Sequence, residues 1–511
     1  MDRLIATFSG LRWVHDEQSF IRLICYTTAF SHALPQMVDA CPTTRSKKLV
    51  YVGRDGRSTG DDYSQYIVAS LLMGGFDVKY LDIVPTPTVQ QLVRNSQCAG
   101  GVIATASHNP PKWNGLKFVG PTSIFLTPDE CTRVYSCVTE EILKKETQSF
   151  LSKSPCRALA QEVVEAIKKK ESYTHGKVKM EYVGSDNAIN EHIKHILAQT
   201  SLVDTASIRE ANFSIGFSGC NASGAVYIAS LCEHLGVNLK VPYMMEPGPL
   251  PLQPEPIPEN LVQFGQAIKE QGDVHVAFAV DPDADRLVVL TETGVPLGED
   301  YTLALCIDYI LSLQQPGEYH IVTNASTSLV VADACKKHEE KGIKGILHYT
   351  AVGEVNVALK MLELGTKCLI GGEGNGGVML PSAHIGRDSI VAIVLVLSWL
   401  AKMRKLYGDK PISELVAEQF QKYYIRKNKY TITSKKRAEL EEKLQNLAKE
   451  TTEYEVDTVD GVKFTSVSSR KWVHIRFSNT EPIIRIIAEA PSEDEAINLI
   501  KTYEKALSLA S

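Results

Sequence analysis

Residues 48–75, KLVYVGRDGRSTGDDYSQYIVASLLMGG, decide the fold class of this chain. They begin with a short apolar run, pass through a polar loop that contains glycine, and end in an amphipathic segment closed by two glycines. This order predicts a strand, a loop and a helix. The same order returns in residues 76–95, and the run AGGVIA at 99–104 adds another strand.

Comparable units occur further along the chain. One covers 213–236 and is followed by a strand at 274–280, and another covers 319–342 and is followed by a strand at 367–372. Strands that alternate with helices indicate mostly parallel sheets. Three weakly similar units predict three α/β domains of related topology, with mixed, mostly parallel sheets flanked by helices.

The pattern changes after about residue 410. Residues 473–510 predict a strand, a loop, a strand and a helix capped by Ser492 with Glu495 three residues later. We therefore expect a smaller C-terminal domain of α+β type. A charged stretch between the first two units predicts helix and linker. The expected division is 1–150, 151–182 (helix and linker), 183–298, 299–409 and 410–511.

Composition excludes several classes of function. The net charge of -6 gives no basic face for nucleic acid. The 11 cysteines include no C-x-x-C pair and indicate free thiols in a reducing compartment. The longest apolar segment, 390–400, is shorter than the roughly 18 residues that span a bilayer, and Asp388 is expected to open it as a buried core helix. We expect a cytosolic protein without membrane contact; the sequence carries no signal for an oligomeric state.

A polar loop, TASHNP at residues 105–110, follows the apolar run of residues 101–104, which predicts the end of a buried strand. The proline fixes the exit of the loop. This holds Ser107 and His108 side by side at the mouth of the sheet, where ligands bind in open α/β folds. A plain turn is the competing interpretation of this loop by itself. No G-x-S-x-G pattern surrounds Ser107, which disfavours a hydrolase nucleophile. Lys117 is near enough in sequence to return to the same loop.

The run DPDADR places Asp281, Asp283 and Asp285 directly after an apolar strand. Carboxylates packed this closely repel one another unless a cation neutralises them, and hard oxygen ligands suit Mg²⁺ or Ca²⁺. An EF-hand would place ligands at these positions and at Glu292. That interpretation fails because Arg286 occupies the glycine position of the EF-hand loop and both flanks read as strands.

Two further loops carry polar groups. In GGEGNGG, residues 371–377, the glycines allow close approach of a ligand, and Glu373 and Asn375 are expected to point into that space. A structural turn explains this loop about as well. In RFSNTEPIIR, residues 476–485, two arginines bracket Ser478, Asn479 and Thr480. Such a loop can form an anion nest, and the arginines favour phosphate over a plain hairpin.

Together the four loops fit phosphoryl transfer on a phosphorylated sugar. The chain resembles the α-D-phosphohexomutases over nearly its whole length, with all four loops in the family's order. Within the family it is most similar to the phosphoglucosamine mutases of the bacterial type. The stretches that carry this likeness are 255–261 (EPIPENL), 351–361 (AVGEVNVALKM), 371–389 (GGEGNGGVMLPSAHIGRDS) and 478–486 (SNTEPIIRI).

The resemblance implies roles for the site residues. Ser107 would carry a phosphoryl group, which is passed to a hexose monophosphate through a bisphosphate intermediate; a hexose bisphosphate primes the enzyme. One Mg²⁺ would be held by the three aspartates and the phosphate on Ser107. Candidates for proton handling and charge stabilisation are His108, Lys117 and Arg12. Residues expected to bind the phosphoserine or the substrate are Arg286, Gly353, Glu354, Glu373, Asn375, Arg476, Ser478, Asn479, Thr480 and Arg485.

The sequence also departs from the family pattern. Trp13 replaces a usual glycine after Arg12 and is expected to crowd that loop. Gly377 stands where some branches carry histidine, which leaves His384 as a substitute acid or base. The expected reaction converts glucosamine 6-phosphate to glucosamine 1-phosphate. Mannose or glucose phosphate is the near alternative; a non-catalytic sugar-phosphate binder and a metal-dependent phosphatase are the others.

Overall fold

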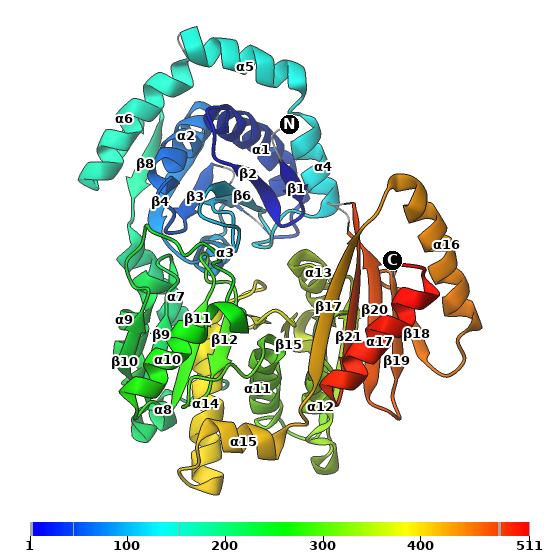
Figure 1. The fold of residues 1–511 in the computed structure, drawn as a ribbon. Coiled ribbons are helices and arrows are strands. Elements are labelled where there is room, and N and C mark those ends of the chain that lie inside the picture. Colours follow the sequence, from blue (N-terminus) through cyan, green and yellow to red (C-terminus); the bar gives the residue numbers. More distant parts are fainter. Residues whose placement is uncertain (1–3, 44, 47, 153, 479–481, 510–511) are drawn as a thin grey trace. The chain divides into compact units, whose positions relative to one another are not determined.

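The computed structural model describes residues 4–43, 45–46, 48–152, 154–478 and 482–509. The chain forms two compact units; Figure 1 labels the helices and strands and colours them along the sequence. The first unit comprises residues 1–298 and 377–409, and the second comprises 299–376 and 410–511. We propose that the four expected domains lie within these units, although residues 377–409 group with the first unit rather than with the rest of 299–409.

The first unit opens with an eight-stranded sheet in the order β1-β2-β6-β5-β3-β4-β8-β7. The pairs β5–β3, β3–β4 and β4–β8 are parallel, and the outer pairs are antiparallel. The strands are β1 (Ile5–Thr7), β2 (Gly10–Val14), β3 (Leu49–Arg54), β4 (Asp77–Ile83), β5 (Gly100–Ala104), β6 (Trp113–Val119), β7 (Tyr173–His175) and β8 (Val178–Tyr182). The sheet is therefore parallel at its centre, and the loop that contains Ser107 begins there, at the end of β5.

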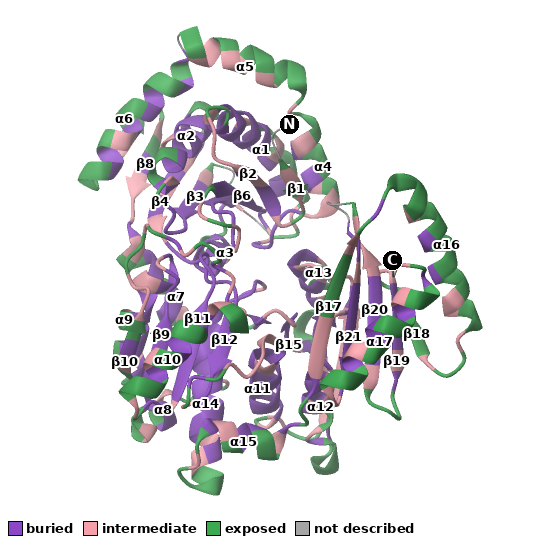
Figure 2. Cartoon of the chain, viewed as in Figure 1, coloured by how far each residue is buried: buried purple, intermediate pink, exposed green. Residues whose placement is uncertain are grey.

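Six helices accompany this sheet. They are α1 (Ser19–Ala40), α2 (Gly60–Met73), α3 (Thr86–Ser96), α4 (Pro128–Ser136), α5 (Glu140–Ser152) and α6 (Pro155–Lys169). Helix α5 buries none of its side chains and is green and pink in Figure 2. Helix α6 buries Leu159, Ala160 and Val163 and packs against α2.

The segment 151–182 is more than the helix and linker that we expected. Its second half is a hairpin, β7–β8, which extends the first sheet, with Met180 opposite Val78 of β4. Met180 and Val78 are both buried. Apolar side chains in this charged stretch therefore face the core of the first sheet, and the segment is part of that layer.

The remainder of the first unit surrounds a second sheet, in the order β10-β9-β11-β12. The first two pairs are parallel and the last is antiparallel. This part of the first unit comprises α7 (Ser185–Leu197), α8 (Thr205–Ala211), β9 (Ser214–Ser218), α9 (Gly224–Leu235), β10 (Asn238–Tyr243), η1 (Pro258–Asn260), α10 (Val262–Gln271), β11 (Val276–Val280) and β12 (Leu287–Leu290); the unit also includes β16 (Gly377–Met379), which is not a strand of this sheet, and α14 (Ser389–Tyr407). Helix α14 is buried along most of its length (Figure 2), as its uninterrupted apolar run predicts. Asp388 caps this helix by accepting from Ile390 N and Val391 N.

In the second unit, β14, β13 and β15 lie side by side in this order and are parallel. Their connections are helical, as the strand–helix repeats predict. The elements are α11 (Glu299–Leu311), β13 (Gly317–Asn324), α12 (Leu329–Lys336), η2 (Glu339–Lys341), β14 (Ile343–Thr350), α13 (Glu354–Leu364), η3 (Gly365–Lys367) and β15 (Cys368–Glu373).

The second unit also holds a sheet in which all four pairs are antiparallel, in the order β17-β21-β20-β19-β18. Its elements are α15 (Ile412–Gln419), β17 (Tyr424–Thr431), α16 (Ser434–Glu450), β18 (Glu455–Asp457), β19 (Val462–Ser466), β20 (Lys471–Phe477), β21 (Ile483–Ala490) and α17 (Glu493–Ala506). Ser492 caps α17 by accepting from Glu495 N. This is the smaller α+β region predicted for the C-terminus. In the described part of the chain, no helix is long and apolar enough to cross a membrane.

Candidate active site

Ser107 lies in a loop that begins where β5 ends, next to the aspartates that follow β11. Its hydroxyl donates to Asp281 Oδ2 over 3.2 Å, and its side chain is almost fully buried. The backbone φ of Ser107 is 48°, a left-handed value that is uncommon for a residue other than glycine. Such strain, of about 1–3 kcal/mol, persists only where the surroundings fix it.

Arg57 fixes this loop, although it lies outside the four sequence motifs. Its side chain is 1% exposed, and its Nη atoms donate to four loop carbonyls: Ser107 O at 2.6 Å, Asn109 O at 2.8 Å, Pro110 O at 3.0 Å and Trp113 O at 2.8 Å. Nε pairs with Asp55 over 3.0 Å. The guanidinium fork is suited to several acceptors held in one plane, so Arg57 acts as the template of the loop.

Asp55 extends this support to the backbone of Ser107. Its Oδ2 accepts from Thr105 Oγ1 over 2.7 Å, and Thr105 Oγ1 in turn accepts from Ser107 N over 2.9 Å. Asp55 and Thr105 are both buried. The sequence does carry a signal for Asp55 and Arg57. The charged turn 55–57 follows β3 at the same edge of the sheet as the serine loop.

The three aspartates are fully buried, and cations compensate their charge: Lys117, Arg387 and, with Nε 4.0 Å from Asp285 Oδ1, Arg286. Lys117 Nζ lies 2.5 Å from Asp283 Oδ2 and 3.0 Å from Asp285 Oδ2, while Arg387 Nη2 lies 2.7 Å from Asp285 Oδ2. Burial by itself would raise the pKa of both carboxyls, but these cations hold each pKa below its usual value. For Asp281, burial and the charges of its two neighbours raise the pKa well above normal. The cluster is therefore short of positive charge at Asp281, beside Ser107.

The donor set of this cluster fits a divalent cation. One oxygen of Asp283 and one of Asp285, the Oδ1 atoms, are buried without a hydrogen-bond partner. Asp281, Asp283 and Asp285 each offer an oxygen within 4.8 Å of the others. Buried polar atoms are nearly always paired, and carboxylate oxygens are the ligands that Mg²⁺ prefers. These two oxygens are therefore suited to bind a hard metal ion.

Arg12 is close to the serine loop. Contrary to the expectation from the sequence, Trp13 does not crowd this loop. Arg12 Nη1 donates to Asn109 Oδ1 over 2.9 Å. Trp13 is fully buried, and its indole nitrogen donates to Tyr63 over 2.9 Å. Successive residues of a strand face opposite sides. The tryptophan of β2 therefore fills the core while Arg12 faces the loop.

His108 lies between Ser107 and Arg286. Its Nδ1 is 3.4 Å from Ser107 Oγ and 3.2 Å from Arg286 Nη2, and Arg286 also pairs with Glu255 over 3.0 Å. Burial, together with Arg286 and Arg12, lowers the pKa of His108 well below its usual value. Since arginine can only donate, Nδ1 of this neutral ring is the acceptor and Nε2 carries the proton. A proton can pass from Ser107 to Nδ1 only if the contact with Arg286 opens.

His384, expected as a substitute for the histidine that some branches carry at position 377 of the loop 371–377 (the sugar loop), is held by Asp388 instead. It is buried, and its Nε2 lies 2.9 Å from Asp388 Oδ2, which also lies 2.9 Å from His192 Nε2. Asp388 already caps α14, so the two rings and two backbone amides satisfy its carboxylate. The cluster joins α7 to the start of α14 and has a structural role.

In the second unit, the sugar-loop residues gather around one carboxylate. Glu373 Oε1 accepts from Gly353 N and from Asn324 Nδ2, both over 2.9 Å, and Asn375 Nδ2 lies 3.4 Å from Oε2. Gly353 has a φ of 125°, which only glycine adopts readily. Glu354 follows it as the buried first residue of α13. Loops 351–354 and 371–375 are therefore one hydrogen-bonded group.

The phosphate-loop arginines are cross-strand neighbours. Arg476 on β20 is opposite Arg485 on β21. Ser478 is buried, and its amide donates to Ile483 O over 2.9 Å. Asn479 and Thr480 lie outside the described residues. Arg476 Nε is 3.2 Å from Asp460 Oδ2 and makes no hydrogen bond to the described part of the chain, so the two side chains form an ion pair, and Asp460 lies outside the four sequence motifs.

Asp300 supports the sugar loop from behind. It is buried, and its Oδ1 accepts from Ser328 N over 2.8 Å. A Cβ added to Gly374 would lie 2.3 Å from the same oxygen, so the loop packs directly on this carboxyl. Burial raises the pKa of Asp300 to about 8. Asp300 is therefore mostly protonated at neutral pH.

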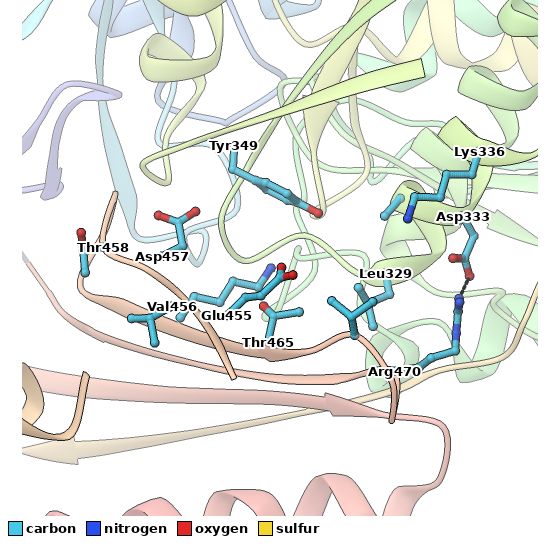
Figure 3. A pocket seen from close by; sticks show the side chains of 13 residues that line it. Leu329, Asp333, Lys336, Tyr349, Glu455, Val456, Asp457, Thr458, Thr465 and Arg470 are labelled. Carbon is cyan, nitrogen blue, oxygen red and sulfur yellow. Dashed lines mark hydrogen bonds and ion pairs between the residues drawn. The ribbon is translucent and has the colours of Figure 1, made fainter. Parts of the chain in front are cut away.

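A cavity of about 570 Å³ lies elsewhere in the second unit, and none of the predicted site residues lines it. Figure 3 shows Tyr349, Asp457 and Thr458 on its walls and the ion pair of Asp333 with Arg470 at one side. Its lining also includes Lys463, which is buried under the rings of Trp472 and Tyr349, 4.4 and 4.8 Å from their centroids. Burial lowers the pKa of this lysine to about 8.

The comparisons with known proteins agree with this geometry. Four family models match in order: phosphoglucomutase/phosphomannomutase α/β/α domains I (residues 9–145), II (190–294) and III (298–423), and the C-terminal domain (432–505). A phosphoglucomutase/phosphomannomutase of Thermococcus kodakarensis is 32% identical over 91% of each chain. The chain belongs to the phosphoglucomutase/phosphomannomutase family, the α-D-phosphohexomutases, as the sequence motifs predict.

Other relatives carry more specific names. A phosphoglucosamine/phosphogalactosamine mutase of Sulfurisphaera tokodaii is 29% identical over 89% of this chain and 90% of its own. Among solved structures, a phosphoglucomutase/phosphomannomutase family protein of Burkholderia thailandensis matches with a TM-score of 0.72 and 22% identity, over 99% of this chain and 97% of the other. The latter likeness shows the fold.

The structure predicts that Arg57→Lys loosens the serine loop. A lysine ammonium cannot serve four carbonyls and Asp55 together, and losing even one charged hydrogen bond costs about 1.5–3 kcal/mol. We expect a lower melting temperature and faster amide hydrogen exchange in residues 105–113, with unchanged exchange in 462–477. Arg133→Lys, at an exposed arginine of α4, is the control. Equal exchange in the two variants would contradict the template role.

Because the pKa of Asp300 is raised, we expect the stability of the protein to depend on pH. Its pKa is about 8 in the folded chain and its usual value is 3.8. Between these values the folded state binds more protons than the unfolded state, so this group makes stability fall as pH rises, by at most about 1.4 kcal/mol per pH unit. Asp300→Asn cannot ionise. Its melting temperature relative to wild type should increase from pH 5.5 to 8, whereas Glu453→Gln, at an exposed carboxylate, should show a constant difference.

Proposed function

We propose that this protein is a phosphohexomutase that moves a phosphoryl group between O6 and O1 of a hexose through a phosphoserine at Ser107. The observation that carries the proposal is the strained, buried Ser107 hydroxyl, 3.2 Å from Asp281 in an acidic cluster with two orphan oxygens. A plain turn needs neither the strain nor the buried carboxylates. A sugar-phosphate binder without catalysis needs no nucleophile beside them.

The reaction conserves phosphate. The bond between phosphorus and Ser107 Oγ breaks as the free hydroxyl of a hexose monophosphate takes the phosphoryl group. That hydroxyl loses its proton to a base or solvent, and Ser107 Oγ takes up a proton in return. The bisphosphate reorients, and its other phosphate returns to Ser107. A hexose bisphosphate primes a dephosphorylated enzyme. This cycle distinguishes a mutase from a phosphatase, which would release inorganic phosphate steadily.

The charged neighbours of Ser107 stabilise charge on the moving phosphoryl group. Asp281, Asp283 and Asp285, together with a phosphate oxygen on Ser107, would hold Mg²⁺. The ion, when bound, neutralises the phosphoryl oxygens. Lys117 is committed to Asp283 and Asp285, so we assign it to the balance of charge in the cluster. Arg286 holds His108 neutral beside the nucleophile.

In the second unit, recognition of the substrate is assigned to Gly353, Glu354, Glu373 and Asn375 for the sugar, and to the phosphate loop for the phosphate that is not being transferred. Arg476 and Arg485 supply charge there, and arginine binds phosphate with two parallel hydrogen bonds. Ser478, Asn479 and Thr480 are assigned to the same loop. This phosphate site is common to all hexose phosphates.

Glucosamine phosphate is the proposed preferred substrate. The support is the GEGNGG loop with Gly377, the phosphoglucosamine mutase names of several relatives, and the carboxylate of Glu373. A carboxylate close to the 2-ammonium group favours an amino sugar. Glucose or mannose phosphate is the second candidate, because a relative with 32% identity is named phosphoglucomutase/phosphomannomutase.

Ser107→Ala tests the nucleophile. Without the hydroxyl, no phosphoserine can form, and turnover should fall to background while the melting temperature stays close to that of wild type. Intact mass after incubation with a hexose bisphosphate should show one added phosphoryl group on wild type and none on the variant. Ser123→Ala, a buried serine of the same domain, is the matched control. Turnover of Ser107→Ala near the wild-type rate would refute the assignment.

The substrate is tested by kcat/KM for glucosamine, glucose and mannose 1-phosphates, each primed with its bisphosphate. We expect glucosamine 1-phosphate to be preferred, with weaker turnover of the other two because they share the phosphate contacts. A preference for either of the others by more than about tenfold, which is roughly 1.4 kcal/mol, would reject glucosamine and leave the mutase assignment intact.

A further inference from the structure

A closed ring of hydrogen bonds and ion pairs joins the sugar loops to the phosphate-loop arginine within the second unit. Glu373 accepts from Gly353 N, and the preceding amide, Val352 N, donates to Asp460 Oδ2 over 3.0 Å. The same oxygen lies 3.2 Å from Arg476 Nε. Two successive backbone amides, Val352 N and Gly353 N, therefore connect the carboxylate of Asp460 with the carboxylate of Glu373.

The other half of the ring runs through a buried histidine. His474 on β20 contacts Ser326 Oγ through Nδ1 over 2.9 Å and Asp460 O through Nε2. Ser326 N donates to Asn324 Oδ1 over 2.9 Å, and Asn324 Nδ2 donates to Glu373. The ring thus returns to Glu373. It fixes both the backbone and the carboxylate of Asp460.

Asp460 is the member that touches both halves of the binding apparatus. Its side chain is 16% exposed and that of Arg476 is 13% exposed, so solvent screens their attraction only in part. Burial lowers the pKa of Arg476 and Asp460 opposes that effect. Asp460 is placed in the loop between β18 and β19, a region that the phosphate and sugar motifs do not include.

We propose that Asp460 is a positioning residue that couples recognition of the sugar to recognition of the phosphate. It attracts the guanidinium of Arg476 from the Nε side through an ion pair rather than a hydrogen bond, and it holds Val352 so that Gly353 N stays on Glu373. Displacement of either loop is thereby transmitted to the other. The inference rests on the proposed function, because it takes these loops as the sugar and phosphate sites.

The test measures binding of glucosamine 1-phosphate by calorimetry in a Ser107→Ala background, where no turnover occurs. Asp460→Asn keeps the size of the side chain but removes the charge that attracts Arg476. We expect Kd to rise about tenfold, which corresponds to 1.4 kcal/mol. Glu455→Gln, at an exposed carboxylate of neighbouring β18, should leave Kd unchanged. Equal Kd values in these two variants would overturn the positioning role.

A double-mutant cycle separates coupling from general damage. Glu373→Gln is combined with Asp460→Asn, and the two losses in affinity are compared with that of the double variant. Residues that act through one network give a combined loss smaller than the product of the separate losses. Independent, multiplicative losses would show that Asp460 supports only Arg476 and would overturn the coupling. Absence of any sugar-phosphate binding by the parent Ser107→Ala protein, with wild type also inactive, would refute the proposed function itself.

Discussion

Three carboxylates buried within five residues impose the main constraint on the first unit. Asp281, Asp283 and Asp285 would repel one another and resist burial. Their burial requires cations at fixed positions, and these come from distant parts of the chain: Lys117 from β6 and Arg387 from the segment before α14. Thr86, at the start of α3, adds a hydroxyl donor to Asp283 over 2.8 Å. Neutralising this charge therefore ties both sheets of the first unit and α14 to one point.

The positive charge is distributed unevenly over the three aspartates, and Asp281, which receives the least, lies beside Ser107. Lys117 and Arg387 face Asp283 and Asp285, whereas Asp281 receives the Ser107 hydroxyl and a backbone amide, Arg286 N. Two oxygens, the Oδ1 atoms of Asp283 and Asp285, remain without a hydrogen-bond partner among the described residues. A folded chain selected only for stability would pair or remove them. The site instead keeps oxygen atoms available for a cation and holds its serine in a strained conformation through Arg57 and Asp55.

In the second unit, carboxylates fix the conformation of the binding loops. Its binding loops contain glycines and backbone amides, which need external acceptors to stay in one conformation. Glu373 supplies them for the sugar loops, Asp460 for Val352 and Arg476, and Asp300 supports Gly374 from below. Each of these carboxylates accepts more than one donor or packs against a loop. The conformation of the loops is therefore fixed by acid groups from a neighbouring strand (Glu373), helix (Asp300) and loop (Asp460).

Sequence by itself determined the repeats of strand and helix, the buried helix opened by Asp388, and the four polar loops with Ser107 and the three aspartates. These features are local: periodicity of apolar residues, capping residues and short motifs leave their mark within about twenty residues. Only the tertiary structure decided that 178–182 joins the first sheet and that Trp13 fills the core. The same is true of His384, which serves α14, and of Arg57, Asp300, Asp460 and His474, which support the site. Their partners lie up to 148 residues away along the chain, as for Ser326 and His474, and charge or hydrogen-bond complementarity at such separations leaves no periodic signal in one sequence.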